Sequence, residues 1–516
     1  MTAPALVPRP THLTTAPGAL ELTEATAVAA PAGVLALLRE LLTPATGLPF
    51  PEAAGAGPGV LSFALSTEPA DLAELGDEGY RLSVADGGLR AVATTETGLL
   101  WAVQTLRQLL APEAYAPTRV AGTAWVLPNV EITDVPRFPW RGALLDVARW
   151  CHPIEFVHAF VDQLAMHKLN TLHLHLTDDQ GWRFEVKKHP RLTEVGAWRT
   201  ESNAGHAFEG RFDGVPHGGY YTQEQLKDLV AYAARRGVRI MPEIDLPGHM
   251  QAAISAYPWL GNDPERQLEV RTAWGISKHV LNVADETLVF LREILDEVVE
   301  VFPFEYVHLG GDEVPLDEWS ASPDALRRVR EAGLAGPQEL LGWWIKQMGE
   351  HLAGHGRRIA VWDELVEAAP PKDALVFAWR GAERVQVALD AGHSVVAVPF
   401  EYVYLDYAQT DRPDEPLAIG GPLPLERVYG FEPVPDGAQG RVLGTQGMLW
   451  SEYTPTPEAV QWRAHPRLSA IAEVAWSPAA GRDPAEFGER LAVQVRRFDQ
   501  AGIRHHDLGS AADDLS

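Results

Sequence analysis

The sequence contains one cysteine, Cys151, among its 516 residues. That scarcity excludes an intramolecular disulfide and any zinc site built from cysteines. No run of about 18 uncharged apolar residues occurs, so no transmembrane helix is expected. Residues 1–20 have no basic start and are interrupted by prolines, which argues against a signal peptide and leads us to expect a cytoplasmic protein.

Positive charge is also scarce, with 43 Lys and Arg against 70 Asp and Glu and a formal net charge of −27. A chain this acidic repels phosphate backbones and anionic surfaces, so neither nucleic acid nor a membrane is an expected partner. Its content of 46% hydrophobic and 22% charged residues is that of an ordinary globular protein. The length predicts several domains and a core that needs no disulfide or metal.

Residues 1–135 are predicted to form a small α+β domain. Alternating stretches at 79–84 and 89–94 flank a turn with Asp-Gly, which is typical of a hairpin. Residues 98–110 carry apolar side chains three and four apart, which predicts an amphipathic helix. The proline-punctuated segment 134–140 is the expected boundary.

Residues 136–482 alternate short apolar runs with helical patterns. Eight runs occur, at 143–147, 171–176, 239–244, 306–309, 358–362, 374–379, 394–398 and 441–449. Helical patterns lie between several of them, at 154–169, 222–237, 286–301 and 337–355. This alternation predicts a (β/α)₈ TIM barrel, with an open doubly wound sheet as the alternative, although no glycine-rich phosphate loop follows the first run. Residues 483–516 are expected to form a C-terminal helix and a polar, frayed tail.

Acidic residues and tryptophans follow most of these runs, where a barrel would place its active site. The sharpest pair is Asp312-Glu313, which comes directly after Gly310-Gly311. Neighbouring residues of a strand face opposite sides, so both acids can enter one pocket only where the glycines end the strand. Two close carboxylates suit glycoside hydrolysis if one stays protonated, although a capped, solvated turn explains the pair as well.

Three tryptophans, Trp362, Trp379 and Trp450, end three different runs. Strand ends converge in a barrel, and aromatic rings stack on the apolar faces of sugars. One such tryptophan would be read as a core residue, but three at corresponding positions favour an aromatic cage for a sugar.

Histidines offer a different interpretation. His173 and His175 alternate in one run and face the same side, so with His249 and Asp312 they could bind a divalent ion in a metal-dependent hydrolase. We favour packed histidines, because a metal leaves the other carboxylates and the tryptophans unexplained. His249 is expected to pair with Asp178 or Asp245.

Several ordered motifs together resemble family 20 glycoside hydrolases, the β-N-acetylhexosaminidases. They span about residues 5–480 and include 104–109, 140–146, 172–182, 218–225, 242–249, 308–313 (HLGGDE), 404–406 and 450–452. The resemblance implies an exo-acting enzyme that releases terminal GlcNAc or GalNAc from a small oligosaccharide or glycoconjugate. The mechanism it implies is retaining and uses the substrate's own acetamido group as nucleophile, through an oxazolinium ion and with no metal or cofactor.

The resemblance also implies roles for individual residues. Glu313 would be the general acid and then the base for water, Asp312 would hold the acetamido N–H, and Tyr404 would bond the acetamido oxygen. The sugar would be enclosed and held by Trp362, Trp379, Trp450, Arg141, Asp406 and Glu452. A supporting network near Glu313 would consist of Asp178, Asp245 and His249.

The chain departs from the family pattern at two places. Phe431 stands where a tryptophan would lie beside the leaving-group subsite, and Ala148-Arg149-Trp150-Cys151-His152 replaces the more usual sequence after the first run. Two further alternatives remain open at this point, a noncatalytic amino-sugar-binding protein and a glycosidase with its own carboxylate nucleophile. The sequence defines no oligomeric state.

Overall fold

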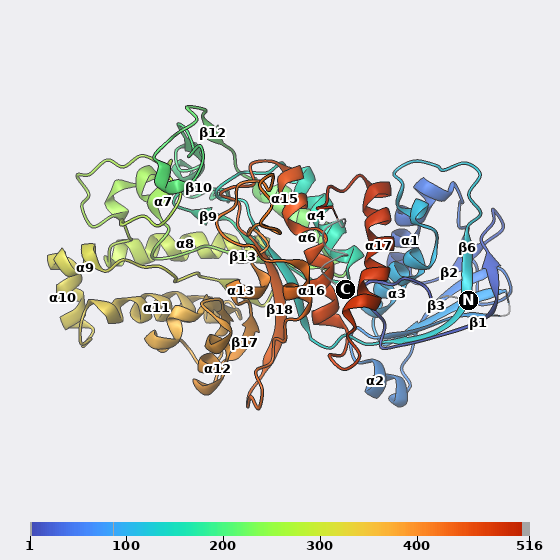
Figure 1. The fold of residues 1–516 in the computed structure, drawn as a ribbon. Helices are drawn as coiled ribbons and strands as arrows, with labels where there is room; N and C mark the ends of the chain where they lie inside the picture. Colours follow the sequence, from blue (N-terminus) through green and yellow to red (C-terminus); the bar gives the residue numbers. More distant parts are fainter. Residues whose placement is uncertain (1–2, 86, 508–516) are drawn as a thin grey trace.

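A computed structural model describes residues 3–85 and 87–507 of the chain. An N-terminal sheet with helices lies at one end of the molecule, and a barrel surrounded by helices occupies the rest (Figure 1). Asp86, in the expected hairpin turn, and residues 508–516, in the expected tail, lie outside the described residues.

The N-terminal part is a six-stranded mixed sheet in the order β1-β6-β4-β5-β3-β2. Its strands are β1 His12–Glu21, β2 Ala27–Ala29, β3 Val60–Leu65, β4 Tyr80–Ala85, β5 Gly88–Ala93 and β6 Val126–Asp134. The helices of this part are α1 Ala32–Thr46, α2 Pro69–Leu75, α3 Glu96–Leu109 and the 3₁₀ turn η1 Pro112–Tyr115. Strands β4 and β5 pair antiparallel, as the alternating pattern predicts. The Thr95 hydroxyl accepts a bond from the Gly98 N–H at 3.3 Å and caps α3.

The second part is a closed barrel of eight parallel strands. In chain order they are β7 Trp140–Asp146, β8 Thr171–His175, β13 Arg239–Glu243, β14 Tyr306–His308, β15 Arg358–Trp362, β16 Leu375–Ala378, β17 Ser394–Ala397 and β18 Val442–Leu449. Strand β7 pairs with β8 on one side and with β18 on the other. That closure confirms the predicted TIM barrel and excludes the open sheet.

Helices cover the outside of the barrel. The longer ones are α4 Ile154–Met166, α6 Gln223–Ala234, α8 Asp285–Val301, α10 Pro323–Glu331, α11 Leu340–Gly354, α12 Ala382–Asp390, α15 Pro457–Ala464 and α16 Arg467–Trp476. Shorter elements in the loops are α5 Arg191–Glu194, α7 Gln251–Ala256, α9 Asp317–Ala321, α13 Phe400–Val403, α14 Leu425–Tyr429, η2 Ala207–Glu209, η3 Pro258–Leu260, η4 Pro337–Glu339 and η5 Asp363–Ala368, with two-stranded pairs β9 Thr177–Asp178 with β10 Gly181–Trp182 and β11 Trp198–Arg199 with β12 His217–Gly218. Thr222 and Gln225 form the predicted capping box at the start of α6.

Buried polar contacts join the N-terminal part to the barrel. The Lys168 ammonium, just before β8, donates to Asp134 of β6 at 2.7 Å and to the Tyr80 hydroxyl at 2.7 Å. The last helix, α17 Pro484–Ala501, lies beside the N-terminal helices (Figure 1), where Arg497 donates to the Gln108 carbonyl at 2.9 Å. These contacts fix the barrel against the N-terminal sheet.

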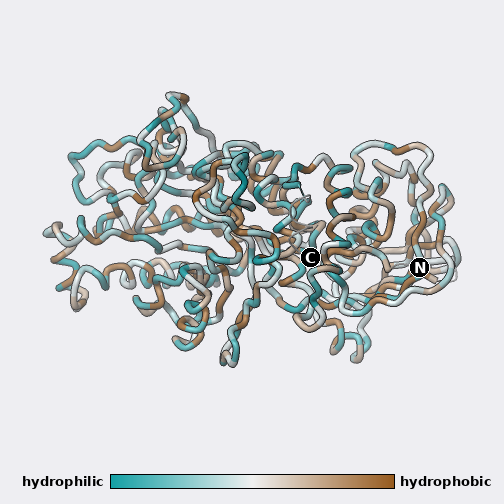
Figure 2. The backbone as a smooth tube through the Cα atoms, in the orientation of Figure 1, coloured by the Kyte–Doolittle hydropathy of each residue, from teal (hydrophilic) through white to brown (hydrophobic). Residues whose placement is uncertain are grey.

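The hydropathy of the backbone follows this architecture. Brown, hydrophobic segments recur along the strands and helices of both parts, and many peripheral loops are teal (Figure 2). Within residues 3–85 and 87–507, no helix combines the length and the apolar character needed to cross a bilayer.

Candidate active site

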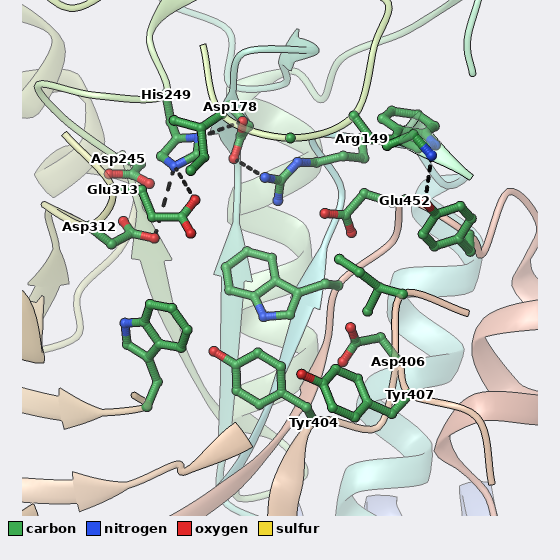
Figure 3. A pocket seen from close by; sticks show the side chains of 18 of the residues that line it. Arg149, Asp178, Asp245, His249, Asp312, Glu313, Tyr404, Asp406, Tyr407 and Glu452 are labelled. Carbon is green, nitrogen blue, oxygen red and sulfur yellow. Dashed lines mark hydrogen bonds and ion pairs between the residues drawn. The ribbon is translucent and has the colours of Figure 1, made fainter. Parts of the chain in front are cut away.

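A pocket of about 440 Å³ lies at the carboxyl ends of the barrel strands, where this fold places active sites. Among its lining residues are Arg149, Asp178, Asp245, His249, Trp274, Asp312, Glu313, Trp362, Trp379, Tyr404, Asp406, Tyr407, Trp450, Glu452 and Tyr453. Eleven of the twelve side chains singled out from the sequence are in the pocket, and Arg141 is the exception. Figure 3 shows the acids, His249 and Arg149 facing one cavity.

The two adjacent acids enter the pocket because the chain turns sharply after β14. Gly310 and Gly311 have φ of 63° and 91°, and Glu313 itself has φ of 49°. A Cβ on Gly310 would lie 1.7 Å from an oxygen of Asp245, so only glycine fits there. The turn is held by a bond from the Gly311 N–H to Asp245 at 3.1 Å. The glycine pair therefore ends the strand and turns both acids into the pocket, as the sequence predicts.

His249 lies between the acid pair and a second group of carboxylates. Its Nε2 is 3.5 Å from Glu313 Oε2 and 4.0 Å from Asp312 Oδ2, and its Nδ1 is 3.1 Å from Asp178 Oδ1 (Figure 3). Burial alone would lower the pKa of His249, but the Asp178 carboxylate outweighs it and the pKa is raised well above its ordinary value. A cationic imidazole therefore faces Glu313 at neutral pH. Of the two expected partners of His249, Asp178 is the one in contact.

Arg149 contacts the second oxygen of Asp178, the carboxylate that also binds His249. Its Nη2 is 2.8 Å from Asp178 Oδ2, and its guanidinium lies 5.3 Å from the ring centre of Trp450. Burial opposes the charge of Arg149, but the surrounding carboxylates raise its pKa well above the ordinary value. Asp178 thus connects the arginine in the pocket to the histidine beside Glu313.

Aromatic rings form the walls around these charged groups. Trp379 stacks on Tyr404, with ring centres 6.2 Å apart and an angle of 27° between the ring planes. The ring centres of Trp362 and Trp450 are 6.0 Å apart. The indole Nε1 of Trp379 is fixed by Glu364 at 2.9 Å. Burial, together with the nearby charge of Asp406, raises the pKa of Tyr404 well above its ordinary value, so its hydroxyl stays protonated and can donate. Such a cage fits the apolar face of a sugar.

Asp312 brings a buried carboxyl oxygen to the pocket. Its Oδ1 is buried and has no hydrogen-bond partner among residues 3–85 and 87–507. Burial first, and then the charge of Asp245, raises the pKa of Asp312 well above its ordinary value. An orphaned acceptor of this kind has a high cost unless a ligand supplies a donor. The pocket therefore presents an acceptor that requires a polar N–H or O–H from the bound molecule.

Asp245→Asn is expected to stabilise the folded chain in a pH-dependent way. Burial, reinforced by neighbouring carboxylates, raises the pKa of Asp245 from 3.8 to about 7. Between these values the folded chain binds more protons than the unfolded chain, so this group makes the free energy of unfolding fall as pH rises. Asparagine keeps the oxygen that accepts from Gly311 but has no charge to bury. We expect no gain near pH 4 and a gain of up to about 4 kcal/mol above pH 7, measured by denaturant unfolding.

Asp414→Asn, at a carboxylate that is 76% exposed, is the control and should change stability little at either pH. A gain of the same size for Asp245→Asn at pH 4 and pH 8 would contradict the assigned cause.

Comparisons with known proteins agree with this geometry. Residues 138–479 match the catalytic domain of glycosyl hydrolase family 20, and residues 3–135 match domain 2 of the same family. The chain belongs to glycosyl hydrolase family 20. The resemblance stated from the sequence motifs is thereby confirmed.

Several known β-hexosaminidases are similar over most of the chain. A β-N-acetylhexosaminidase of Cellulomonas fimi is 33% identical over 97% of this chain and 96% of its own length. A β-hexosaminidase of Porphyromonas gingivalis is 40% identical, but this chain spans only 55% of that protein's length. The chain likewise spans 65% of the length of a β-hexosaminidase of Vibrio furnissii. The solved structure of a Streptomyces coelicolor β-N-acetylhexosaminidase has a TM-score of 0.85 with 30% identity, and 98% of each chain is covered.

The placement of Arg141 in this family 20 pocket was wrong. Arg141 stands at the start of β7, at the amino end of the barrel, because that strand begins at Trp140. Its guanidinium is fully buried, donates to the Phe138 carbonyl at 2.8 Å and pairs with Glu78 of the N-terminal part. The arginine of the pocket is Arg149, three residues after the strand ends. For the other strands, the candidate residues were sought after the end of the strand. The same search after β7 would have found Arg149.

The histidines of the proposed metal site do not come together. Both ring nitrogens of His175 face carboxylates, Glu243 on one side and Asp178 at 3.0 Å on the other. His173 also contacts Glu243, at 3.0 Å, whereas His249 belongs to the pocket. The predicted packing of the first two histidines in the barrel interior therefore describes them correctly.

Phe431 does not line the pocket. It is buried against Tyr402, with ring centres 4.9 Å apart. Sequence reasoning also missed Trp274, Tyr407 and Tyr453, which do line it. Trp274 lies in the long connection between β13 and β14, far along the chain from either strand. Tyr407 and Tyr453 directly follow Asp406 and Glu452, so inspection of one further residue at each of these places would have found them.

Proposed function

We propose that the chain is an exo-acting β-N-acetylhexosaminidase, which releases terminal GlcNAc or GalNAc from small oligosaccharides or glycoconjugates. The carrying observation is the unpartnered Oδ1 of Asp312, next to Glu313 and enclosed by aromatic rings. A 2-acetamido sugar supplies both the N–H that this oxygen needs and apolar faces for the rings. Support also comes from a Vibrio harveyi exo-β-N-acetylglucosaminidase solved with N-acetylglucosamine, which is 32% identical with a TM-score of 0.87 and is covered over 79% of its length.

In the proposed mechanism the acetamido oxygen of the substrate attacks C1 and forms an oxazolinium ion, with retention after water attack. Glu313 protonates the leaving oxygen and then accepts the proton of the attacking water. Its side chain is 35% exposed, against 13% for Asp312, which suits a group that must meet both the leaving group and water. His249 orients Glu313 and is itself oriented by Asp178.

The remaining roles concern binding. Asp312 accepts the acetamido N–H and stabilises the positive charge that develops there, and Tyr404 donates to the acetamido oxygen. Asp245 holds the turn that carries Asp312. Trp362, Trp379 and Trp450 enclose the acetamido methyl and the sugar ring, which fixes the reacting atoms in an attack geometry. The sugar hydroxyls are held by Arg149, Asp406 and Glu452 through charge-assisted bonds.

The deciding experiment is release of 4-nitrophenol from its β-N-acetylglucosaminide, with the plain β-glucoside in parallel. Turnover of the first substrate alone supports the acetamido-assisted mechanism, whereas turnover of both requires an enzyme nucleophile. No turnover of either favours the sugar-binding alternative. Activity that disappears after exhaustive EDTA treatment and returns with a divalent ion would favour the metal-dependent alternative.

Arg149→Lys and Arg141→Lys are expected to separate substrate binding from structure. Lysine cannot make the forked contacts of a guanidinium, so Arg149→Lys should lower kcat/KM for the nitrophenyl N-acetylglucosaminide by about 10- to 100-fold. Arg141→Lys should leave kcat/KM of the folded protein nearly unchanged and lower the melting temperature. Steady-state kinetics and thermal unfolding of both variants provide the measurement. The reverse pattern would restore Arg141 as the binding residue.

A further inference from the structure

A second group of ligand-type side chains lies outside the barrel, between two of its covering helices. His351 and His355 are four residues apart at the end of α11, so they share one face of that helix. Asp296 lies in the last turns of α8, and α8 packs beside α11 (Figure 1). None of the three lines the active-site pocket.

The three side chains converge on one point. The Nε2 atoms of His351 and His355 are 2.7 and 2.9 Å from the same oxygen, Oδ1 of Asp296. The imidazole ring centres are 5.0 Å apart. One ligand atom from each of the three residues therefore lies within 4.8 Å of the other two, as a shared ion requires.

No lysine or arginine of the described residues pairs with the Asp296 carboxylate. Within the described ranges 3–85 and 87–507, the ion pairs of Asp296 are with these two histidines. The side chains are 19% exposed for His351, 40% for His355 and 46% for Asp296, so solvent reaches the cluster. A divalent cation bound here would offset the charge of the Asp296 carboxylate and take one nitrogen ligand from each histidine.

We propose that Asp296, His351 and His355 bind one zinc ion and so connect α8 to α11. Two imidazoles and one carboxylate are a donor set that zinc accepts, with metal–ligand distances of about 2.0–2.2 Å. A tetrahedral site places its ligand atoms about 3.3 Å apart, so the present contacts need to open by only about half an ångström. The exposed side of the cluster leaves the fourth position to water.

The other groups in the described chain that could hold a metal are less suitable. His173, Glu243 and His308 form a fully buried cluster in the barrel interior, which gives an ion no entry. The remaining groups share His249, a pocket residue that the proposed mechanism already uses. The cluster at Asp296 is the one open to solvent and independent of the proposed hydrolysis.

Binding of Co²⁺ and Zn²⁺ tests the proposal. The full chain without a histidine tag is freed of metal with EDTA, which is then removed. Co²⁺ is added and followed by its visible absorption, which is strong for tetrahedral sites, and zinc affinity is measured by competition with a chromogenic chelator. We expect one equivalent to bind and the melting temperature to rise, because the ion binds only the folded chain. His351→Gln and His355→Gln should each weaken zinc binding by about tenfold or more.

His505→Gln is the matched control, because His505 forms another surface pair, with Asp499 at 3.0 Å, that has no second histidine ligand. It should bind zinc like the wild type. His355→Gln should hydrolyse the nitrophenyl substrate at the wild-type rate, since it lies outside the pocket. The proposal is overturned if the wild type binds no ion, or if both glutamine variants bind it unchanged. Loss of binding in His249→Gln with retention in His355→Gln would also overturn it, by placing the ion in the pocket.

Discussion

Glu313→Gln should lower turnover of 4-nitrophenyl β-N-acetylglucosaminide by about 10²- to 10⁴-fold, the contribution of a positioned general acid. The substitution keeps the size of the side chain and its contact with His249 but removes the proton that the leaving oxygen needs. The loss should therefore depend on the leaving group. It should be largest for a second sugar, a poor leaving group, and smallest for 2,4-dinitrophenol, which departs without protonation. The measurement is kcat across this series of aglycones.

Glu367→Gln supplies the control for this change, since Glu367 is a surface carboxylate, 57% exposed and paired with Arg384. Its turnover should match that of the wild type for every aglycone. An equal loss with all leaving groups in Glu313→Gln would remove Glu313 from the role of acid and leave it a structural part of the pocket.

Much of the fold follows from local patterns. Buried parallel strands read as short apolar runs, and all eight runs correspond to barrel strands, from Trp140–Asp146 to Val442–Leu449. The later helices were harder to recognise. The chain between β17 and β18 carries only the short helices Phe400–Val403 and Leu425–Tyr429, which leave too few turns for a periodic pattern.

The pocket could be predicted where residues directly follow a strand. Trp362 ends its strand, and Trp379, Trp450 and the Asp312-Glu313 pair follow theirs within a few residues, so the barrel itself gathers them. Arg141 and Arg149 show the limit of this reasoning. Both belong to the first strand unit, but the choice between them depends on which end of β7 each side chain occupies, and the motif resemblance did not resolve it.

Contacts between strand units were the least predictable. Asp178 binds both Arg149 and His249. The three residues come from three different loops, and their approach depends on barrel closure. The pKa shifts of these groups depend in turn on burial and on each other's charge, which no single segment encodes. Sequence patterns therefore predict the members of the pocket better than its internal pairing.

Asp312→Asn should lower kcat/KM by about 10²- to 10³-fold for every aglycone, including 2,4-dinitrophenol, because the cation it stabilises forms whichever group leaves. Asparagine has nearly the same shape, so the loss measures the missing charge. The Asp312 carboxylate must be ionised to act, and burial together with Asp245 raises its pKa. On acidification, wild-type activity should therefore be lost at a higher pH than it would be if Asp312 had the pKa of an ordinary aspartate. Asp245→Asn should move this acidic limb to lower pH, whereas Asp414→Asn should not. A loss in Asp312→Asn that vanishes with the dinitrophenyl substrate would assign Asp312 to leaving-group protonation and refute its role at the acetamido nitrogen.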